Sequence, residues 1–137
     1  MFVTLFVGVL DLATGLLTYS NAGHDAPLLI GRGVEPLPCD ANLPLGIMAH
    51  WEFSLQQVSL DAQTTIFLFT DGLNEAENMV HEQFGDNQIV QVAASLLANG
   101  ENRPTALVGR MAEAVQAFVG EAEQSDDLTM LAIKYMK

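Results

Sequence analysis

The sequence is poor in positive charge. Only 5 lysine and arginine residues stand against 17 aspartate and glutamate residues, which gives a formal net charge of −12. A surface this acidic repels nucleic-acid phosphates and excludes nucleic-acid binding by the unaided chain. It does not exclude anionic substrates, because bound metal cations can stand between such a substrate and the protein.

Cysteine and long apolar runs are also scarce. The single cysteine, Cys39, cannot form a disulfide within the chain, and no basic n-region of a signal peptide opens the sequence. These absences predict a cytoplasmic protein in which Cys39 is a structural loop or core residue. The apolar stretches are far shorter than the roughly 20 residues that span a bilayer, so we expect no membrane segment.

The chain does contain enough apolar sequence for one globular unit. Its 137 residues are 50% hydrophobic and 16% charged, a composition that excludes disordered and fibrous chains. Because the sequence shows no internal repeat and no linker, we treat residues 1–137 as a single domain region.

The apolar pattern changes from strand-like to helical along the chain. Residues 2–10 form an apolar run that predicts a buried strand, and turn residues 11–15 lead into a second strand at 16–20. Further strands are predicted at 27–30, 51–60, 64–69 and 128–136, with helices ending near 99 and spanning 104–119. Hairpin-linked strands and helices grouped in sequence predict an α+β fold with antiparallel sheets.

Two acidic positions each adjoin a predicted strand. Asp71 and Gly72 follow the strand that starts at Thr64, and Asp126 and Asp127 precede the last strand. If the two strands are neighbours, the carboxylates meet at one sheet edge, where oxygen ligands on a rigid base suit Mg²⁺ or Mn²⁺. Gly72 would let a backbone carbonyl approach such a cation closely, so Gly72 is counted with Asp71 and Asp126 as a candidate metal-site residue. From spacing alone, the alternative is a simple Asp-Gly turn and a solvated loop.

Four short motifs follow one another along the chain. They are Tyr19-Ser-Asn-Ala-Gly-His-Asp-Ala-Pro-Leu-Leu29, Leu43-Pro-Leu-Gly46, Phe67-Leu-Phe-Thr-Asp-Gly-Leu-Asn-Glu-Ala76 and Ser125-Asp-Asp-Leu-Thr-Met-Leu131. Each motif alone is weak, but the ordered set covers nearly the whole chain. In this order the chain resembles the bacterial branch of the PPM (protein phosphatase 2C-like) family, which includes the sporulation stage II E phosphatase and phosphatases that regulate sigma factors.

The resemblance implies an α-β-β-α sandwich, in which helices flank two antiparallel sheets and a two-metal site lies at one end. It implies Mn²⁺- or Mg²⁺-dependent hydrolysis of phosphoserine or phosphothreonine on a protein, typically an anti-sigma-factor antagonist, by a metal-activated water. By motif match, Asp71 and Asp126 are metal-binding aspartates, which overturns the turn-and-loop alternative. Asp127 and Asn21 are implied to support the site from outside the metal ligands.

His24 lies in the first motif and has two interpretations. It is a proton donor or water-holding residue near the metals, or it hydrogen-bonds a tight turn that Asn21 and Gly23 shape. His50 and His81 lie outside the motifs and are interpreted as ordinary surface or loop residues.

One part of the family pattern is absent from the sequence. A complete family domain carries an earlier Asp-Gly element that bridges both metals, whereas Asp71-Gly72 is the only Asp-Gly pair here. We therefore expect the C-terminal part of such a domain, with weak metal binding, little phosphatase activity alone, and uncovered edges that favour a homodimer. The alternatives are a non-catalytic binding or regulatory module and an inactive fragment of a longer signalling protein with a sensor or receiver domain upstream.

Overall fold

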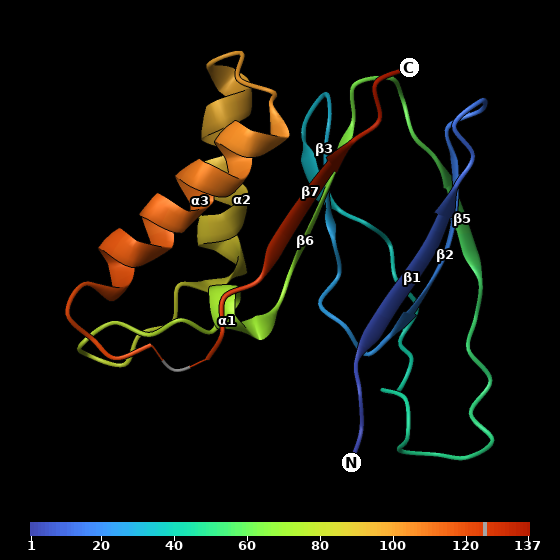
Figure 1. Ribbon diagram of the computed structural model, residues 1–137, viewed down its shortest axis with the longest axis horizontal. Coiled ribbons are helices and arrows are strands. Elements are labelled where there is room, and N and C mark those ends of the chain that lie inside the picture. The colour runs from blue at the N-terminus through green and yellow to red at the C-terminus, as the bar shows by residue number, and fades with distance from the viewer. Residues whose placement is uncertain (125) are drawn as a thin grey trace.

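Two antiparallel sheets lie face to face in the computed structural model, and helices cover the outer face of one of them (Figure 1). The structure describes residues 1–124 and 126–137. The strands are β1 (Leu5–Leu10), β2 (Leu16–Ala22), β3 (Leu28–Ile30), β4 (Val34–Pro36), β5 (Gln56–Ser59), β6 (Thr65–Phe69) and β7 (Met130–Lys134), and the helices are α1 (Asp71–Asn74), α2 (Gly85–Ala98) and α3 (Pro104–Val119). The first sheet has the order β1-β2-β5, and the second has the order β4-β3-β6-β7.

β6 is the central strand that the apolar run predicts. It pairs with β3 on one side and β7 on the other, and only Leu68 of its five residues is not fully buried. Phe67 and Phe69 point into the core shared with α2 and α3, whereas Ile66 packs into the core between the two sheets. Because side chains alternate along a strand, β6 contributes to both cores.

The two long helices form as their 3.6-residue periodicity predicts. Their buried residues (Ile89 and Ala93 of α2; Leu107, Met111 and Val115 of α3) pack against the second sheet. Pro104 occupies the first turn of α3, where its missing N–H leaves no hydrogen bond unmade. Gly120 follows α3 with φ +61°, a conformation that glycine adopts readily.

The first hairpin has the predicted five-residue connection. The Asp11 amide donates to the Leu16 carbonyl at 2.8 Å, and the Gly15 amide donates to the Asp11 carbonyl at 2.7 Å. Gly15 has a positive φ, +79°, which suits glycine at the last position of the turn. β2 continues past the predicted end at residue 20 to Ala22, so Asn21 is part of the strand.

β1 is not the buried strand that the sequence predicts. It is one edge of the first sheet, and Leu5, Val7 and Val9 are 41%, 51% and 69% exposed on its outer side. Phe6 and Leu10 point the other way, into the core between the sheets. An uncharged apolar run does not reveal how many faces are covered, because that depends on layers contributed by distant segments.

Two other strand predictions need correction. The strand expected over 51–60 is confined to β5, because residues 51–55 lie in a loop. Conversely, residues 34–36, where the sequence analysis predicts no strand, form β4, which includes Pro36. Proline is tolerated there because β4 is an edge strand and need not donate on its outer side.

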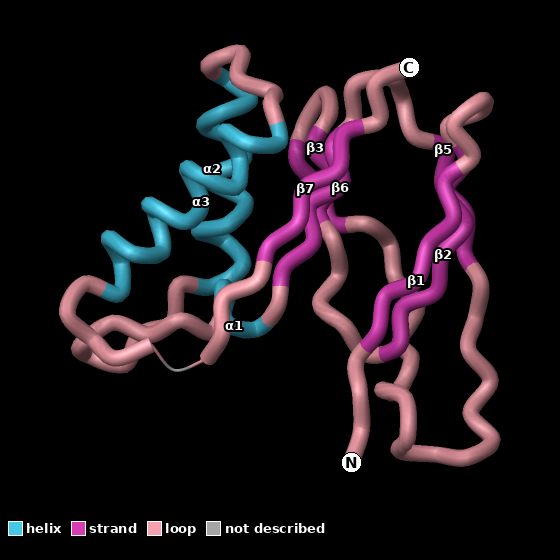
Figure 2. Tube along the Cα trace, in the orientation of Figure 1, coloured by secondary structure: helices cyan, strands magenta, loops and turns pink. Residues whose placement is uncertain are grey.

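The predicted α+β class with antiparallel sheets is confirmed. Of the layers that the resemblance implies, the residues described here form one helical layer and two sheets, and loops rather than helices border the first sheet in Figure 2. Within residues 1–124 and 126–137, no helix is long and apolar enough to cross a bilayer.

Candidate functional site

The ends of β6 and β7 bring the two acidic positions to the same edge of the second sheet. The strands pair from Thr65↔Lys134 to Phe69↔Met130, and beyond β6 the Thr70 amide donates to the Thr129 carbonyl at 3.2 Å. The segment that opens with Asp71 therefore leaves the sheet beside the segment that contains Asp126 and Asp127. All three carboxylate residues are exposed. Ser125 of the fourth motif lies outside the described residues.

Gly72 is buried against the backbone of this second segment. A Cβ at position 72 would overlap the Asp127 carbonyl oxygen and would lie 3.2 Å from the Leu128 Cα. Gly72 thus makes a close backbone approach, to the carbonyl of Asp127, and its predicted place in a metal site stays a prediction. Only glycine leaves room for it, so Gly72 holds the 126–128 segment against α1.

A third carboxyl group, that of Asp25, lies at this site and was not predicted from the sequence. Its side chain hydrogen-bonds that of Asp71. Asn74 Nδ2 donates to Asp86 Oδ1 at 3.2 Å and makes a longer contact of 3.4 Å with Asp25 Oδ1. The only sequence signal was an acidic residue directly after His24; its nearness to Asp71 requires the fold.

The environment of Asp25 favours its protonated form. Burial is the main cause that raises the pKa of Asp25, to about 7, and the hydrogen bond and negative charge of Asp71 act in the same direction. Asp86 raises this pKa further, while His24 lowers it. Two carboxyl groups in contact thus avoid carrying two full negative charges at the edge of the sheet.

Asn21 and His24 form the turn that connects β2 to β3. The buried Asn21 accepts from the His24 amide and donates to the His24 carbonyl, both at 2.8 Å. Asn21 therefore shapes the turn. The His24 Nδ1 lies 3.0 Å from the Asp25 carbonyl, and because a carbonyl only accepts, this contact assigns the ring proton to Nδ1.

His24 also lines a cavity of about 280 Å³ beside the same strand ends. Thr70 and Thr129 line it where β6 ends and β7 begins, and Phe6 and Leu131 line it between the sheets. The turn of the first motif and the aspartates of the third and fourth motifs are thereby gathered at one end of the sandwich.

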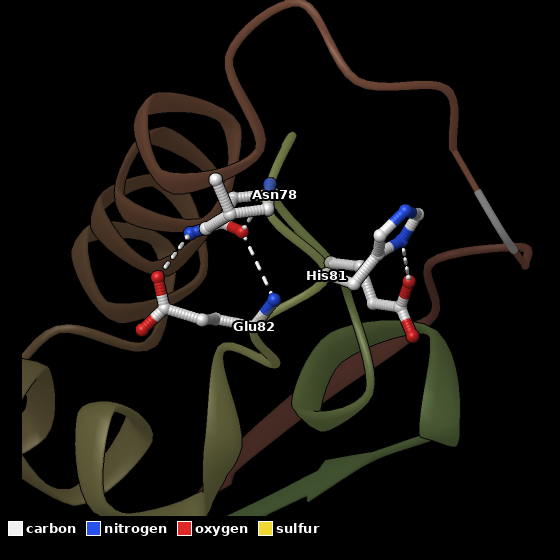
Figure 3. A network of polar contacts seen from close by, with 5 residues as sticks. Asn78, His81 and Glu82 are labelled. Atoms are coloured by element: carbon white, nitrogen blue, oxygen red, sulfur yellow. Dashed lines mark hydrogen bonds and ion pairs between the residues drawn. The ribbon is translucent and has the colours of Figure 1, made fainter.

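The loop between α1 and α2 is closed by its own polar groups (Figure 3). Asn78 Oδ1 accepts from the amides of Val80 and Glu82, at 3.1 and 3.0 Å. His81 Nδ1 lies 3.2 Å from Glu77 Oε2. His81 is therefore an exposed loop residue, as predicted, and its partner is Glu77 rather than a member of the candidate site.

The donor atoms at this edge suit Mg²⁺ or Mn²⁺ in kind. The exposed carboxylates supply oxygen ligands, and on either side of Asp71 the buried Thr70 Oγ1 and Asn74 Oδ1 have no hydrogen-bond partner among the described residues. Across 1–124 and 126–137, however, no group of three or more His, Cys, Asp or Glu side chains is placed to hold a metal ion. These residues thus fit a cation chemically without assembling a two-metal centre.

The arrangement of sheets and helices matches the fold of PP2C-type phosphatase domains. The phosphatase domain of SpoIIE from Bacillus subtilis, presoaked with Mn, matches with a TM-score of 0.75 and 19% identity over 98% of this chain and 56% of that chain. The RsbU and RsbW domains of Rv1364c from Mycobacterium tuberculosis match with a TM-score of 0.73 and 24% identity, over 96% of this chain and 35% of that chain.

The chain belongs to the stage II sporulation protein E (SpoIIE) family, whose model matches residues 1–136. It is 28% identical over 134 residues to Protein IcfG from Synechocystis sp. (strain ATCC 27184 / PCC 6803 / Kazusa). This match covers 97% of this chain and 20% of that protein. The chain therefore spans about half of the matched SpoIIE phosphatase domain (56%) and one fifth of Protein IcfG.

Replacing Gly72 by alanine tests the close approach to Asp127. The added methyl group overlaps the Asp127 carbonyl oxygen, so we expect the free energy of unfolding to fall by about 1–3 kcal/mol. Gly109→Ala in α3 is the matched control, because no heavy atom lies within 4 Å of its added Cβ, and it should be neutral or stabilising. Urea unfolding measures both variants, and equal stabilities would contradict the packing described here.

Replacing Asp25 by asparagine tests the carboxyl pair. The pKa of the Asp25 carboxyl group is 3.8 when unperturbed and about 7 in the folded chain. The folded chain therefore holds the carboxyl proton more tightly than the unfolded chain does, and the free energy of unfolding falls as the pH rises between these two values. Asp25→Asn should remove this slope and, after allowing for solvent screening, stabilise the chain by about 1 kcal/mol above neutral pH. Urea unfolding across this range measures the slope. Asp86→Asn, which does not remove the Asp71 contact, should keep most of the slope; an unchanged slope in Asp25→Asn would refute the pair.

Proposed function

We propose that this chain forms the Asp71- and Asp126-bearing part of a metal-dependent protein serine/threonine phosphatase that acts on a regulatory phosphoprotein. The observation that carries the proposal is the packing of Gly72 against the Asp127 backbone where β6 ends and β7 begins, which holds both acidic positions at one edge. Membership of the SpoIIE family and the fold match to a SpoIIE phosphatase domain support the reaction class.

In this proposal, Asp71 and Asp126 hold Mn²⁺ or Mg²⁺ through carboxylate oxygens. When bound, such cations supply Lewis acidity and water activated for attack on a phosphoryl group, so no covalent protein nucleophile is required. Gly72 keeps the two ligand-bearing segments at a fixed separation, and strand pairing beneath them gives the ligands a rigid base. Asp127 contributes its backbone carbonyl to the packing and stays outside the direct ligands.

In this proposal, His24 holds water or donates a proton beside the strand ends. The Nδ1 proton is directed at the Asp25 carbonyl, so Nε2 is the ring nitrogen left for water or substrate, and without a proton it would accept a hydrogen bond. Donation of a proton to the leaving serine oxygen would instead require the doubly protonated ring. Asn21 fixes the turn that carries the ring in either role.

The substrate class is a phosphoserine or phosphothreonine protein, with a small anti-sigma-factor antagonist as the specific candidate. The net charge of −12 repels a phosphorylated partner unless cations are bound at the reacting edge. Metal loading therefore both activates water and allows the substrate to approach. A sensor or receiver domain elsewhere in the full-length protein would control this cytoplasmic reaction.

A non-catalytic binding module is the second candidate function. It is favoured by the finding that, in the part of the chain described, no three metal-ligating side chains come together. In that case Asp71 and Asp126 would keep their places at the sheet edge, and the domain would dock a regulatory protein without turnover.

The 137-residue chain alone is expected to bind Mn²⁺ weakly and to show little or no phosphatase activity. Few carboxylates converge on one point, and affinity for hard cations depends on the number of oxygen ligands. Isothermal titration calorimetry measures the binding. Tight binding of two Mn²⁺ ions would contradict the expectation, and Asp71→Asn should weaken whatever binding is present.

In the full-length protein, Asp71→Asn and Asp126→Asn should each lower Mn²⁺-dependent hydrolysis of a phosphoserine peptide at least about a hundredfold, because each removes a charged ligand. Asp61→Asn is the matched control, since Asp61 is exposed near the opposite end of β6 and its only described ion pair is a 3.9 Å contact with Arg32. Activity retained in both site variants would refute the ligand roles. Loss of activity in the control as well would show a non-specific effect of charge.

A further inference from the structure

A cavity of about 410 Å³ opens at the opposite end of the second sheet from the candidate site. It lies at the end that carries the α2–α3 connection and the β3–β4 turn (Figure 1). Its walls come from β3, β6, α2, α3 and the turns that adjoin them, and no residue of β1 lines it. Cavities of a few hundred Å³ suit small organic ligands.

One wall of this cavity is apolar, and the opposite wall carries two hydroxyl groups. The apolar wall is formed by the helix residues Ala93, Leu96, Leu97 and Leu107. Thr64 and Thr65, which are only 7% and 5% exposed, line the side of the sheet. Neither hydroxyl makes a hydrogen bond among the described residues, and neither is sealed from water as Thr70 Oγ1 is. Both hydroxyls are therefore left to bond with whatever occupies the cavity.

The rim of the cavity is far less acidic than the chain as a whole. Two of the five lysine and arginine residues, Arg32 and Arg103, lie there with one carboxylate each, Asp61 and Glu101, so the rim has no net charge. α3 also begins here, at Pro104, with no side-chain cap and no acidic residue in its first turn. The partial positive charge of the helix end is thus not neutralised locally. An anion can approach this rim without a bound metal ion.

Glu101 fixes the orientation of the Arg103 side chain at the rim. Arg103 Nε and Nη2 donate to the two carboxylate oxygens of Glu101 at 2.9 and 2.8 Å. This paired contact holds the plane of the guanidinium group, and the N–H groups on Nη1 remain for a ligand. The Arg32 side chain is 94% exposed and lies 3.9 Å from Asp61, so it can turn toward the same ligand.

We propose that this cavity binds a small hydroxylated organic anion. Its apolar body would lie between the helices and the sheet, its hydroxyl group would bond with Thr64 or Thr65, and its acidic group would bind Arg103 and Arg32 at the rim. Such a ligand matches the apolar wall, the unbonded hydroxyls and the cationic groups together. This inference does not depend on metal binding or on phosphatase activity.

Titration of the isotope-labelled 137-residue chain with para-hydroxyphenylacetate in metal-free buffer tests the proposal by the chemical shifts of backbone amides. We expect saturable shifts at residues 31–32, 63–65 and 101–107. Phenylacetate, para-cresol and acetate each lack one part of the probe and should bind at least about threefold more weakly. No saturable shift at these residues, or equal binding of any of the three comparators, would overturn the proposal.

Glutamine substitutions test the cationic rim. Arg103→Gln and, independently, Arg32→Gln should each weaken binding of the probe at least about threefold, because each removes a charged donor. Arg110→Gln is the matched control: Arg110 lies on α3 outside the cavity, contacts Glu113 at 3.8 Å, and undergoes the same charge change. Equal effects of all three substitutions would overturn binding at the rim.

Thr65→Val tests the unbonded hydroxyl, because valine keeps the shape of threonine. The affinity for para-hydroxyphenylacetate should fall to that for phenylacetate, while the free energy of unfolding stays the same or rises, since no hydrogen bond within the chain is lost. Urea unfolding measures the second quantity. A fall in stability would mean that the hydroxyl already has a partner in the chain, which would overturn its assignment to a ligand.

The same titration of the full-length protein, with metal ions removed by a chelator, tests the cavity outside the 137-residue chain. The affinity for para-hydroxyphenylacetate should be unchanged, and Arg103→Gln should weaken it as before. Loss of binding in the full-length protein would mean that another segment fills the cavity, and this result would overturn the proposal.

Discussion

The antiparallel pairing of β6 with β7 is the contact on which the rest of the structure depends. It joins segments that are more than 50 residues apart, from Thr65↔Lys134 to Phe69↔Met130. Phe67 and Phe69 face the helices only in this register, since a shift of one residue would turn each side chain to the opposite face. The same register sets Asp71 beside the segment that contains Asp126. Core packing and site geometry are therefore fixed together.

Strong local patterns account for the parts of the fold that could be predicted. The β-branched and aromatic run before Asp71 predicts a central strand, and the helical period between Pro104 and Gly120 marks α3 from first to last turn. These segments are recognisable because their own side chains fill a core. The Asp-Gly pair at 71–72 indicated a position where another group could come close to the backbone, but the sequence does not reveal that this group is the Asp127 carbonyl.

Features that depend on distant segments could not be predicted. The exposure of β1 follows from which layers cover it, and the pairing of residues 34–36 follows from where β3 runs. Asp25 resembles any acidic loop residue until the β2–β3 turn sets it against Asp71. Local sequence thus predicts strands and helices well, whereas burial and side-chain neighbours at the site arise from tertiary contacts.

The final residues of the chain hold the first hairpin in place. The Tyr135 hydroxyl donates to the Leu12 carbonyl at 3.1 Å, and Lys137 Nζ donates to the Ala13 carbonyl at 3.0 Å, while the Tyr135 ring is buried between the sheets. During synthesis, the β1–β2 hairpin leaves the ribosome long before these partners exist. Residues of β3 and β6 can cover part of its inner face earlier, but the place that Tyr135 fills stays open until the last strand is made, so packing between the two sheets is completed late.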